Sequence, residues 1–142
     1  MKTLLAALFA LALAACTAAP VAPRNAADAE AKKFQPLPDK AVVYIVRLPV
    51  DSFNTGALSL GNAGSIGTYQ GTYYRWEATP GVQRIETVGA NMSVVTIDAQ
   101  PGRIYFVQHR VIGGPRVGVV GAVVQRLDDE TGRRMVLASH HQ

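Results

Sequence analysis

The chain has few of the features that would cross-link it or hold it across a membrane. Its single cysteine, Cys16, has no partner within the chain, so no internal disulfide can form. Only 17% of the residues are charged and 49% are hydrophobic, a balance that excludes an intrinsically disordered protein. The longest apolar run, Leu4 to Ala15, rises only ~18 Å as a helix, too short for the ~30 Å hydrocarbon core of a bilayer. With 142 residues, one folded domain is expected.

Residues 1–15 have the layout of a secretory signal peptide. Lys2 supplies the positive start, an apolar region follows, and the segment ends in small residues. At its end, Leu13-Ala14-Ala15-Cys16 resembles the lipobox of bacterial lipoproteins at every position. The resemblance implies cleavage before Cys16 and a diacylglyceryl group on the Cys16 thiol, the only strong nucleophile available. The alternative is an ordinary signal peptide cleaved near residues 12–14, with a cysteine there by chance.

The expected location is the cell envelope, with the protein anchored by lipid. An unpaired thiol in an exported chain is explained simply by lipidation, and several acyl chains together hold firmly in a bilayer. Thr17 follows Cys16 where the lipoprotein resemblance associates Asp with inner-membrane retention, so the periplasmic face of the outer membrane is expected. Without Lys2, thirteen Lys and Arg stand against ten Asp and Glu, a net charge of +3. Export and the lack of a basic stripe exclude nucleic acid as a partner.

Residues 16–40 are expected to form the lipidated cysteine and a flexible tether rich in Ala and Pro. Thr17 to Lys40 holds four of the eight prolines and no glycine, and it shows neither a strand period nor a sustained apolar helical face. A flexible chain of this length would place the folded part roughly 25 to 30 Å from the lipid. The domain itself is therefore expected over residues 41–142.

Residues 41–142 break into short β-rich runs separated by turn residues. The first run, Ala41 to Leu48, is almost continuously apolar, which predicts a strand covered on both faces. Asn62-Ala63-Gly64 predicts a hairpin, and Pro80-Gly81 and Pro101-Gly102 predict type II turns. The pattern predicts an all-β fold, a single antiparallel β-sandwich of about seven to eight short strands with no helix. The later strands are expected at 82–88, 93–99, 103–112, 117–127 and 134–139, with an acidic turn at 128–132.

Four short segments carry a resemblance to a known family. They are the Val-Val-Tyr-Ile-Val-Arg strand at 42–47, Gly67 to Tyr74, Pro80-Gly81, and Pro101 to Val107. In this order they resemble the domain of unknown function 2846 family of small bacterial lipoproteins, over about residues 41–137. The resemblance implies a transthyretin-like or prealbumin-like β-sandwich and carries over no catalytic residue. The Gly-rich stretch 113–121 departs from the pattern, which leaves the pairing of the later strands open.

The sequence contains no constellation that predicts catalysis or nucleotide binding. Ser65 lies in Gly64-Ser65-Ile66-Gly67, which lacks the Gly-x-Ser-x-Gly spacing of a hydrolase nucleophile and is typical of a turn. The glycines at 113–121 lack both the dinucleotide spacing and the Lys-Ser/Thr pair of a phosphate loop. We therefore expect a protein that is not an enzyme, with no catalytic residue and no cofactor other than the covalent lipid on Cys16.

The three histidines do not predict a metal site. His140 and His141 are adjacent, so on a strand they would point to opposite faces, and they are expected at a frayed chain end. His109 is expected as a partly exposed strand residue. No metal ligand is therefore assigned.

The aromatic run at 69–76 is the most distinctive candidate for a binding surface. A strand alternates its faces, so Tyr73 with Arg75 and Tyr74 with Trp76 form two sets, one of which is expected to face outward. An exposed Tyr beside Arg suits a sugar ring or a protein partner, so Tyr73, Arg75 and Trp76 are candidate contact residues. The alternative is that these rings are core residues with their polar tips at the rim.

These features together predict a membrane-anchored periplasmic lipoprotein whose non-catalytic β-sandwich is an interaction or scaffold module. Its expected partners are the bilayer, through Cys16, and an envelope protein or the cell wall. One alternative is binding of peptidoglycan or another envelope glycan through Tyr73, Arg75 or Trp76. Another is an inhibitor or immunity protein that plugs an envelope hydrolase with a loop such as 52–56 or 113–116.

Overall fold

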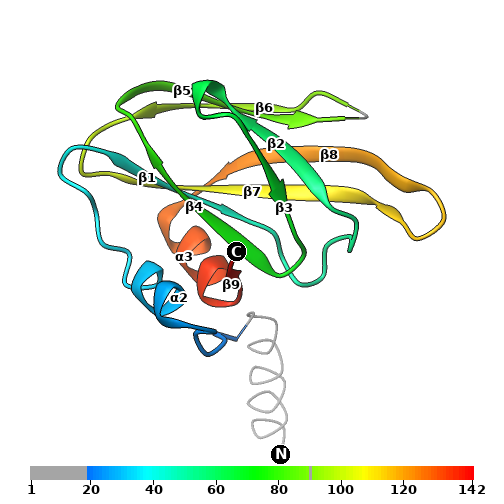
Figure 1. The fold of residues 1–142 in the computed structure, drawn as a ribbon, viewed down its shortest axis with the longest axis horizontal. Coiled ribbons are helices and arrows are strands. Elements are labelled where there is room, and N and C mark those ends of the chain that lie inside the picture. The colour runs from blue at the N-terminus through cyan, green and yellow to red at the C-terminus, as the bar shows by residue number, and fades with distance from the viewer. Residues whose placement is uncertain (1–18, 90) are drawn as a thin grey trace, which may run out of the picture.

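The computed structural model describes residues 19–89 and 91–142, in which two β-sheets pack together beside two α-helices (Figure 1). One sheet has the strand order β8-β7-β1-β4-β9, and the other has the order β3-β2-β5-β6. The predicted β-sandwich is confirmed. The strands are β1 (Ala41–Val46), β2 (Gly56–Leu60), β3 (Ser65–Thr68), β4 (Thr72–Ala78), β5 (Gly81–Val88), β6 (Val94–Ala99), β7 (Ile104–Gly114), β8 (Gly118–Leu127) and β9 (His140–His141). The helices are α2 (Ala26–Ala31), α3 (Asp129–Leu137) and the short 3-10 helix η2 (Gly61–Ala63).

Strand β1 is the centre of the five-stranded sheet. All six of its residues are buried, as predicted for a strand covered on both faces. It pairs antiparallel with β4 but parallel with β7, and β9 pairs parallel with β4. The sheet is therefore mixed and not wholly antiparallel as predicted. The reason is that the chain leaves β6 in the other sheet and enters β7 at the end where β1 also begins.

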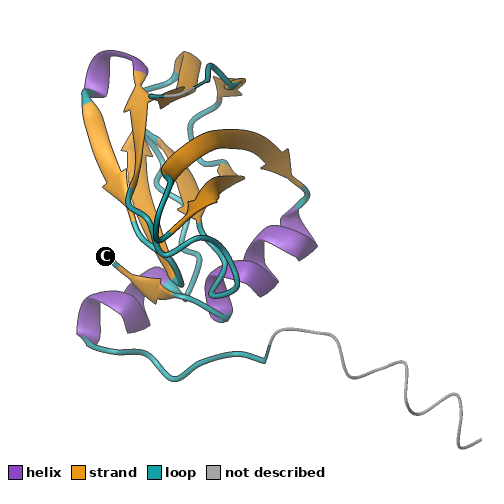
Figure 2. Ribbon diagram, turned by 90° about the vertical axis from the view of Figure 1, so that its right-hand side faces the viewer, coloured by secondary structure: helices purple, strands orange, loops and turns teal. Residues whose placement is uncertain are grey.

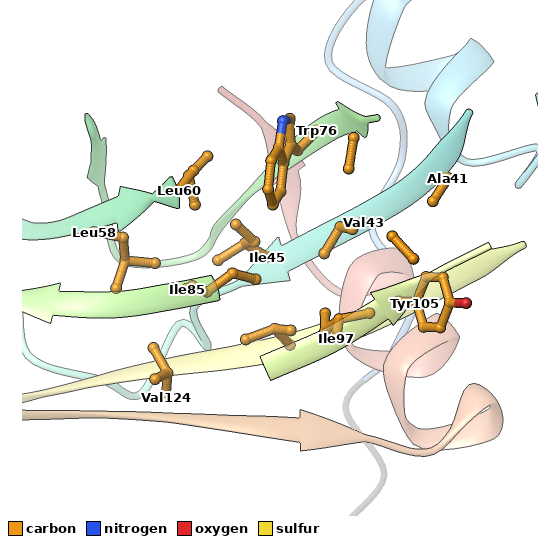
Figure 3. Packing of buried hydrophobic residues seen from close by; sticks show 13 residues of the cluster. Ala41, Val43, Ile45, Leu58, Leu60, Trp76, Ile85, Ile97, Tyr105 and Val124 are labelled. Carbon is orange, nitrogen blue, oxygen red and sulfur yellow. The ribbon is translucent and has the colours of Figure 1, made fainter. Parts of the chain in front are cut away.

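The main core lies between the two sheets (Figure 3). Val43 and Ile45 from β1 meet Leu58, Ile85 and Ile97 from the four-stranded sheet, and each of these side chains is at most 1% exposed. Ile97 lies on the inward side of β6, as the alternation over residues 93–99 predicts. Burying a side chain of this size contributes about 1.5 to 3 kcal/mol, so this cluster supplies stability that no disulfide provides.

A second apolar cluster lies on the other face of the five-stranded sheet, under α2 and α3 (Figure 2). Tyr44, Tyr73 and Phe106 pack there against Ala31 of α2 and Val136 of α3. The rings of Tyr44 and Phe106 are stacked, with centroids 5.4 Å apart and planes at 18°. The helices thus cover a sheet face that would otherwise be open to solvent, which explains why β1 is apolar on both sides.

The predicted turns lie where the chain changes direction. Gly81 has φ 115° and Gly102 has φ 73°, backbone conformations that favour glycine. The first of these turns connects β4 to β5 and the second connects β6 to β7, so each carries the chain from one sheet to the other. The predicted hairpin around Asn62-Ala63-Gly64 is also confirmed, because β2 and β3 pair antiparallel on either side of it.

Residues 129–137 form helix α3, so the predictions of a strand at 134–139 and of a fold without helices are wrong. The Asp128 side chain caps the helix by accepting a hydrogen bond of 2.8 Å from the Thr131 N–H. Gly132 is typical of a turn in sequence, but here it brings α3 close to the sheet: a Cβ atom would lie 2.1 Å from Phe106 Cγ. Two i,i+4 ion pairs join the helical turns, Asp129–Arg133 and Glu130–Arg134.

Much of the segment predicted to be a flexible tether is folded against the domain. The Asn25 side chain caps α2, and the carbonyl of Ala31 accepts a 2.6 Å hydrogen bond from the Tyr44 hydroxyl. Upstream, the Val21 N–H donates to the carbonyl of Leu137 at 2.9 Å. Docking against the sheet stabilises a helix that would be marginal alone. The predicted signal peptide and Cys16 lie outside the described residues, and none of the helices that are described is long and apolar enough to span a membrane.

Side chains from the connection between β5 and β6 bond to part of the free edge of β8. Asn91 donates to the carbonyl of Ala122 at 2.8 Å and accepts from its N–H at 2.6 Å. Ser93 Oγ accepts from the Val124 N–H at 3.1 Å in the same way. These contacts occupy backbone groups that an added strand would use, so this stretch of the edge is protected against pairing with another chain.

Candidate functional site

Strand β4 carries the candidate contact residues Tyr73, Arg75 and Trp76. Tyr73 is fully buried under the helices, and Trp76, 8% exposed, lies in the core between the sheets (Figure 3). Both faces of β4 are covered, so neither ring is placed to stack on a sugar. Of the three, only Arg75 reaches the surface, where its Nη1 lies 2.6 Å from Glu77 Oε1. The structure therefore does not bring the three together as one binding surface.

Tyr73 belongs to a buried cluster around Asp28. The Tyr73 hydroxyl donates to Asp28 Oδ1 at 2.6 Å, the Arg24 N–H donates to Oδ2 at 2.9 Å, and Lys32 Nζ lies 3.4 Å from Oδ1. Burial raises the pKa of Asp28, but these hydrogen bonds and the Lys32 charge outweigh it and lower the pKa to about 2. The His141 N–H also donates to Oδ1, at 3.3 Å. One carboxylate thus joins the N-terminal segment, β4 and the C-terminal strand.

The C-terminal histidines are consequently ordered, in contrast to the predicted frayed end. His140 and His141 form β9 and pair with Thr72 and Tyr73 of β4. His140 Nδ1 lies 3.5 Å from Asp28 Oδ2, beside the same cluster. In the structure, both residues form the edge strand of the five-stranded sheet.

Arg47 and Asp51 hold the loop between β1 and β2. Arg47 is 1% exposed, and its guanidinium donates to the backbone carbonyls of Ser52, Asn54 and Thr68. Asp51 accepts from Arg47 Nε at 3.3 Å and from the Val111 N–H at 3.1 Å. The N–H groups of this buried cation are directed at the protein itself, so the pair fixes the loop against β7.

His109 is fully buried, so the prediction of a partly exposed residue is wrong. Its Nδ1 is hydrogen-bonded to Thr68 Oγ1 at 2.9 Å, and its Nε2 has no partner among the described residues. Burial and then the positive charge of Arg47 lower the pKa of His109 to about 4, which keeps the ring neutral at pH 7. A Cβ on Gly56 would lie 2.6 Å from His109 Cε1. Packed this tightly and sealed from solvent, the ring is not placed to exchange a proton with a substrate.

A surface pocket of about 540 Å³ lies where the N-terminal segment passes the first residues of β7 and α3. Arginine side chains and aromatic rings line it together. Arg126 lies over the ring of Tyr105, 5.1 Å from its centroid, and Arg133 lies over the ring of Phe34 at 4.7 Å. Arg103 is a further lining residue. We refer to this site as the arginine pocket.

The charges of the arginine pocket are only partly satisfied within the protein. Arg133 pairs with Asp129 at 2.7 Å, and Asp128 is occupied as the cap of α3. Arg103 and Arg126 are exposed, and neither has a carboxylate within 4.0 Å in the described part of the chain. Two guanidinium groups are therefore available to an acidic group from outside.

Sequence reasoning did not identify the arginine pocket, because its residues come from four separate segments. Phe34 lies in the predicted tether, Arg103 follows a predicted turn, Arg126 lies near the end of a strand, and Arg133 lies in the helix that was not predicted. The only signal in the sequence is that ten of the fourteen basic residues are Arg, and this does not indicate where a binding site would lie.

Comparisons with known proteins leave the function to be argued from this geometry. No protein-family model, no curated protein and no solved structure matches the chain. The resemblances to bacterial lipoproteins and to the domain of unknown function 2846 family stay predictions. Within residues 19–89 and 91–142, no group of three His, Cys, Asp or Glu side chains is arranged to hold a metal ion.

Proposed function

We propose that this chain is a lipid-anchored protein of the bacterial envelope whose β-sandwich binds another envelope component without catalysis. The lipobox-like sequence ending at Cys16 supports the anchor and a location at the periplasmic face of the outer membrane. The observation that carries the binding role is the arginine pocket, in which Arg103 and Arg126 are exposed and free of carboxylate partners in the described chain. The chemistry of such a site suits recognition of a ligand and not proton transfer, since arginine does not lose its proton in proteins.

The pocket suits a partner group that is acidic and has a flat or apolar body. A guanidinium binds a carboxylate through two parallel hydrogen bonds. Arg126 lies against Tyr105, which restricts the guanidinium and so reduces the entropy lost on binding. Aromatic walls such as Phe34 add apolar contact area beside the charge. We therefore expect an acidic segment of an envelope protein as the ligand.

Site-specific photo-crosslinking in the living envelope tests this function. Asp129 lines the pocket and its side chain is 65% exposed, so a photoreactive residue there reports on an occupant, and the same residue at Val82, 74% exposed, is the control. We expect a discrete crosslinked protein from position 129 that is lost in the Arg103→Ala/Arg126→Ala variant. The matched Arg84→Ala variant removes an exposed arginine from another face and should keep the crosslink. Equal crosslinking in both variants would remove the support for the pocket.

Cell-wall glycan is the second candidate ligand. The residues that would bind it are the same arginines and not the aromatic residues of β4. Peptidoglycan carries free carboxylates on its peptide stems, which Arg103 and Arg126 would bind by the same chemistry. Sedimentation of the domain with purified cell wall distinguishes the two functions. If the native protein pellets with the cell wall and the double arginine variant pellets less, the ligand is the glycan polymer. If the native protein stays in the supernatant, a protein partner is favoured.

A further inference from the structure

The described chain begins at the same end of the sandwich as four connections, and we call this the loop end. It contains the β1–β2 loop (47–55), the β3–β4 turn (69–71), the β5–β6 connection and the β7–β8 turn (115–117), toward the right of Figure 1. Hydrogen bonds link it to the start of the chain. The Val21 N–H donates to Leu137, the His140 N–H to Gly71, and the Gly71 N–H to Leu48 at the start of the β1–β2 loop.

The distance from Cys16 to the loop end is limited by the chain. Val21 is the fifth residue after Cys16, and five residues span at most about 18 Å even when fully extended. Because the Val21 N–H is bonded to Leu137, a lipid on Cys16 would lie within that reach of Leu137, three residues before His140, whose N–H is bonded to Gly71 at the loop end. The folded N-terminal segment thus replaces the long spacing expected of a flexible tether with a short link.

The loop end exposes large apolar side chains at its tips. Val50 is 89% exposed and Phe53 59% exposed in the β1–β2 loop, and Val117 is 67% exposed in the β7–β8 turn. Met92, in the β5–β6 connection, is 77% exposed. A single exposed apolar side chain is ordinary, but several on neighbouring loops are typical of a surface that binds a protein or a membrane. At the opposite end of the strands, Val82 is the comparable residue.

These tips are held in place by the polar groups described above. The buried Arg47 guanidinium bonds the carbonyls of the β1–β2 loop, and Asp51 bonds it to β7. Asn54 Nδ2 reaches the carbonyls of Gly114 at 3.4 Å and Gly118 at 3.3 Å, which joins this loop to the β7–β8 turn. The exposed apolar side chains therefore stand on a preorganised support, which lowers the entropy lost when they bind a surface.

Exposed carboxylates are distributed unevenly between the two ends. Exposed Arg110 and Arg116 lie at the loop end, where the carboxylate of Asp51 is largely buried and paired with Arg47. Exposed carboxylates gather at the opposite end, near the ends of β4 and β6, before β1 and at the start of α3: Asp39, Glu77, Asp98, Asp128, Asp129 and Glu130. The loop end is thus apolar with a positive rim, whereas at the other end exposed carboxylates lie beside exposed arginines such as Arg103 and Arg126.

We infer that the loop end lies on the surface of the bilayer that holds the lipid on Cys16, with Val50, Phe53 and Val117 inserted among the headgroups. The inference rests on the proposed lipidation. Apolar tips suit the boundary between headgroups and acyl chains, and Arg110 and Arg116 suit anionic headgroups. In this orientation the arginine pocket, at the far end of β7, faces away from the membrane toward a partner.

Quenching of tryptophan by brominated lipid measures the insertion directly. The mature lipidated protein is reconstituted into vesicles of phosphatidylcholine and phosphatidylglycerol, with and without bromine on the acyl chains. Phe53→Trp carries the probe at the loop end and Val82→Trp carries the control at the opposite end, while native Trp76 is buried and gives a constant background. We expect brominated lipid to reduce the emission from position 53 about twofold and to leave position 82 unchanged.

Flotation of the same samples separates failure of the anchor from failure of the docking. If the protein floats with vesicles but positions 53 and 82 are equally unquenched, the loop end does not insert and the inference is overturned while the anchor stands. If the protein made in bacteria carries no lipid, the proposed anchor fails. The purified chain is then coupled through Cys16, its only cysteine, to a maleimide lipid, and quenching at position 53 alone still decides whether the loop end inserts.

Discussion

Replacing Gly132 by Ala tests how α3 is held on the sheet, because two opposing effects predict opposite changes in the free energy of unfolding. In an exposed helix this substitution stabilises by about 1 kcal/mol, since Ala has the higher helix propensity. In α3 the new Cβ would lie 2.1 Å from Phe106 Cγ and 2.3 Å from its Cβ, against a normal carbon contact of about 3.5 to 4.0 Å. The helix would have to move outward by about 1.5 Å, because turning the ring about its own axis leaves Phe106 Cβ and Cγ in place.

We expect the steric effect to exceed the helix propensity. Overpacking of a tight core costs about 1 to 3 kcal/mol, and here the clash involves three atoms of the Phe106 side chain, which is 1% exposed. We take the upper part of this range, which leaves a net loss of about 2 kcal/mol in the free energy of unfolding and a fall in Tm of roughly 6 to 10 °C. Urea unfolding followed by the fluorescence of Trp76, the only tryptophan, measures it.

Two controls make the result specific to this contact. Glu130→Ala changes a side chain that is 91% exposed on the same helix, so its effect should stay within about 0.5 kcal/mol. Phe106→Ala removes two of the three clashing atoms, Cγ and Cδ1, so adding Gly132→Ala to that background should cost at least about 1 kcal/mol less than in the native protein. A Gly132→Ala variant as stable as the native protein would refute the packing described for α3.

Three further predictions concern the buried polar clusters. Asp28→Asn should lower the free energy of unfolding by about 2 kcal/mol at pH 7, because the carboxylate pKa of about 2 lies below its usual 3.8. The stability that Asp28 adds to the native protein should disappear as pH falls from about 4 to about 2. A variant with the same dependence of stability on pH as the native protein would contradict this. The native protein should lose stability as pH falls from 6.5 to about 4, because the unfolded chain binds a proton that the buried ring of His109 excludes. His109→Leu should make this loss smaller. An unchanged slope of stability against pH would count against the buried neutral ring. Arg47→Met should cost about 3 kcal/mol or more by leaving Asp51 unpaired, and Asp51→Asn should recover part of it; a loss below about 1 kcal/mol would show that the pair does not hold the loop.

The sandwich itself could be predicted from sequence because its signals are local. The continuous apolar run of β1 predicts burial on both faces, and Pro80-Gly81 and Pro101-Gly102 predict the changes of direction, whatever lies elsewhere in the chain. The alternation in β6 likewise places Ile97 inward. Each of these signals depends on neighbours within a few residues.

The helical face and the arginine pocket could not be predicted, because they depend on contacts between distant segments. Gly132 is typical of a turn until Phe106 is known to lie against it, and the short α2 becomes stable only through contacts with Tyr44 and Tyr73. Without these helices, one face of β4 is expected to be exposed, and Tyr73 becomes a candidate contact residue. The arginine pocket also depends on a helix that was not predicted, since Arg133 reaches it only from α3.

Lipidation of Cys16 is the central claim, and metabolic labelling with an alkyne fatty acid tests it most directly. The full-length chain and its Cys16→Ala variant are expressed in a bacterial host, and label, intact mass and membrane association are measured together. The account predicts a labelled native protein in the membrane fraction, with a mass that fits cleavage before Cys16 plus acyl chains, and an unlabelled variant released from the membrane. An unlabelled native protein, or equal membrane association of both chains, would contradict it.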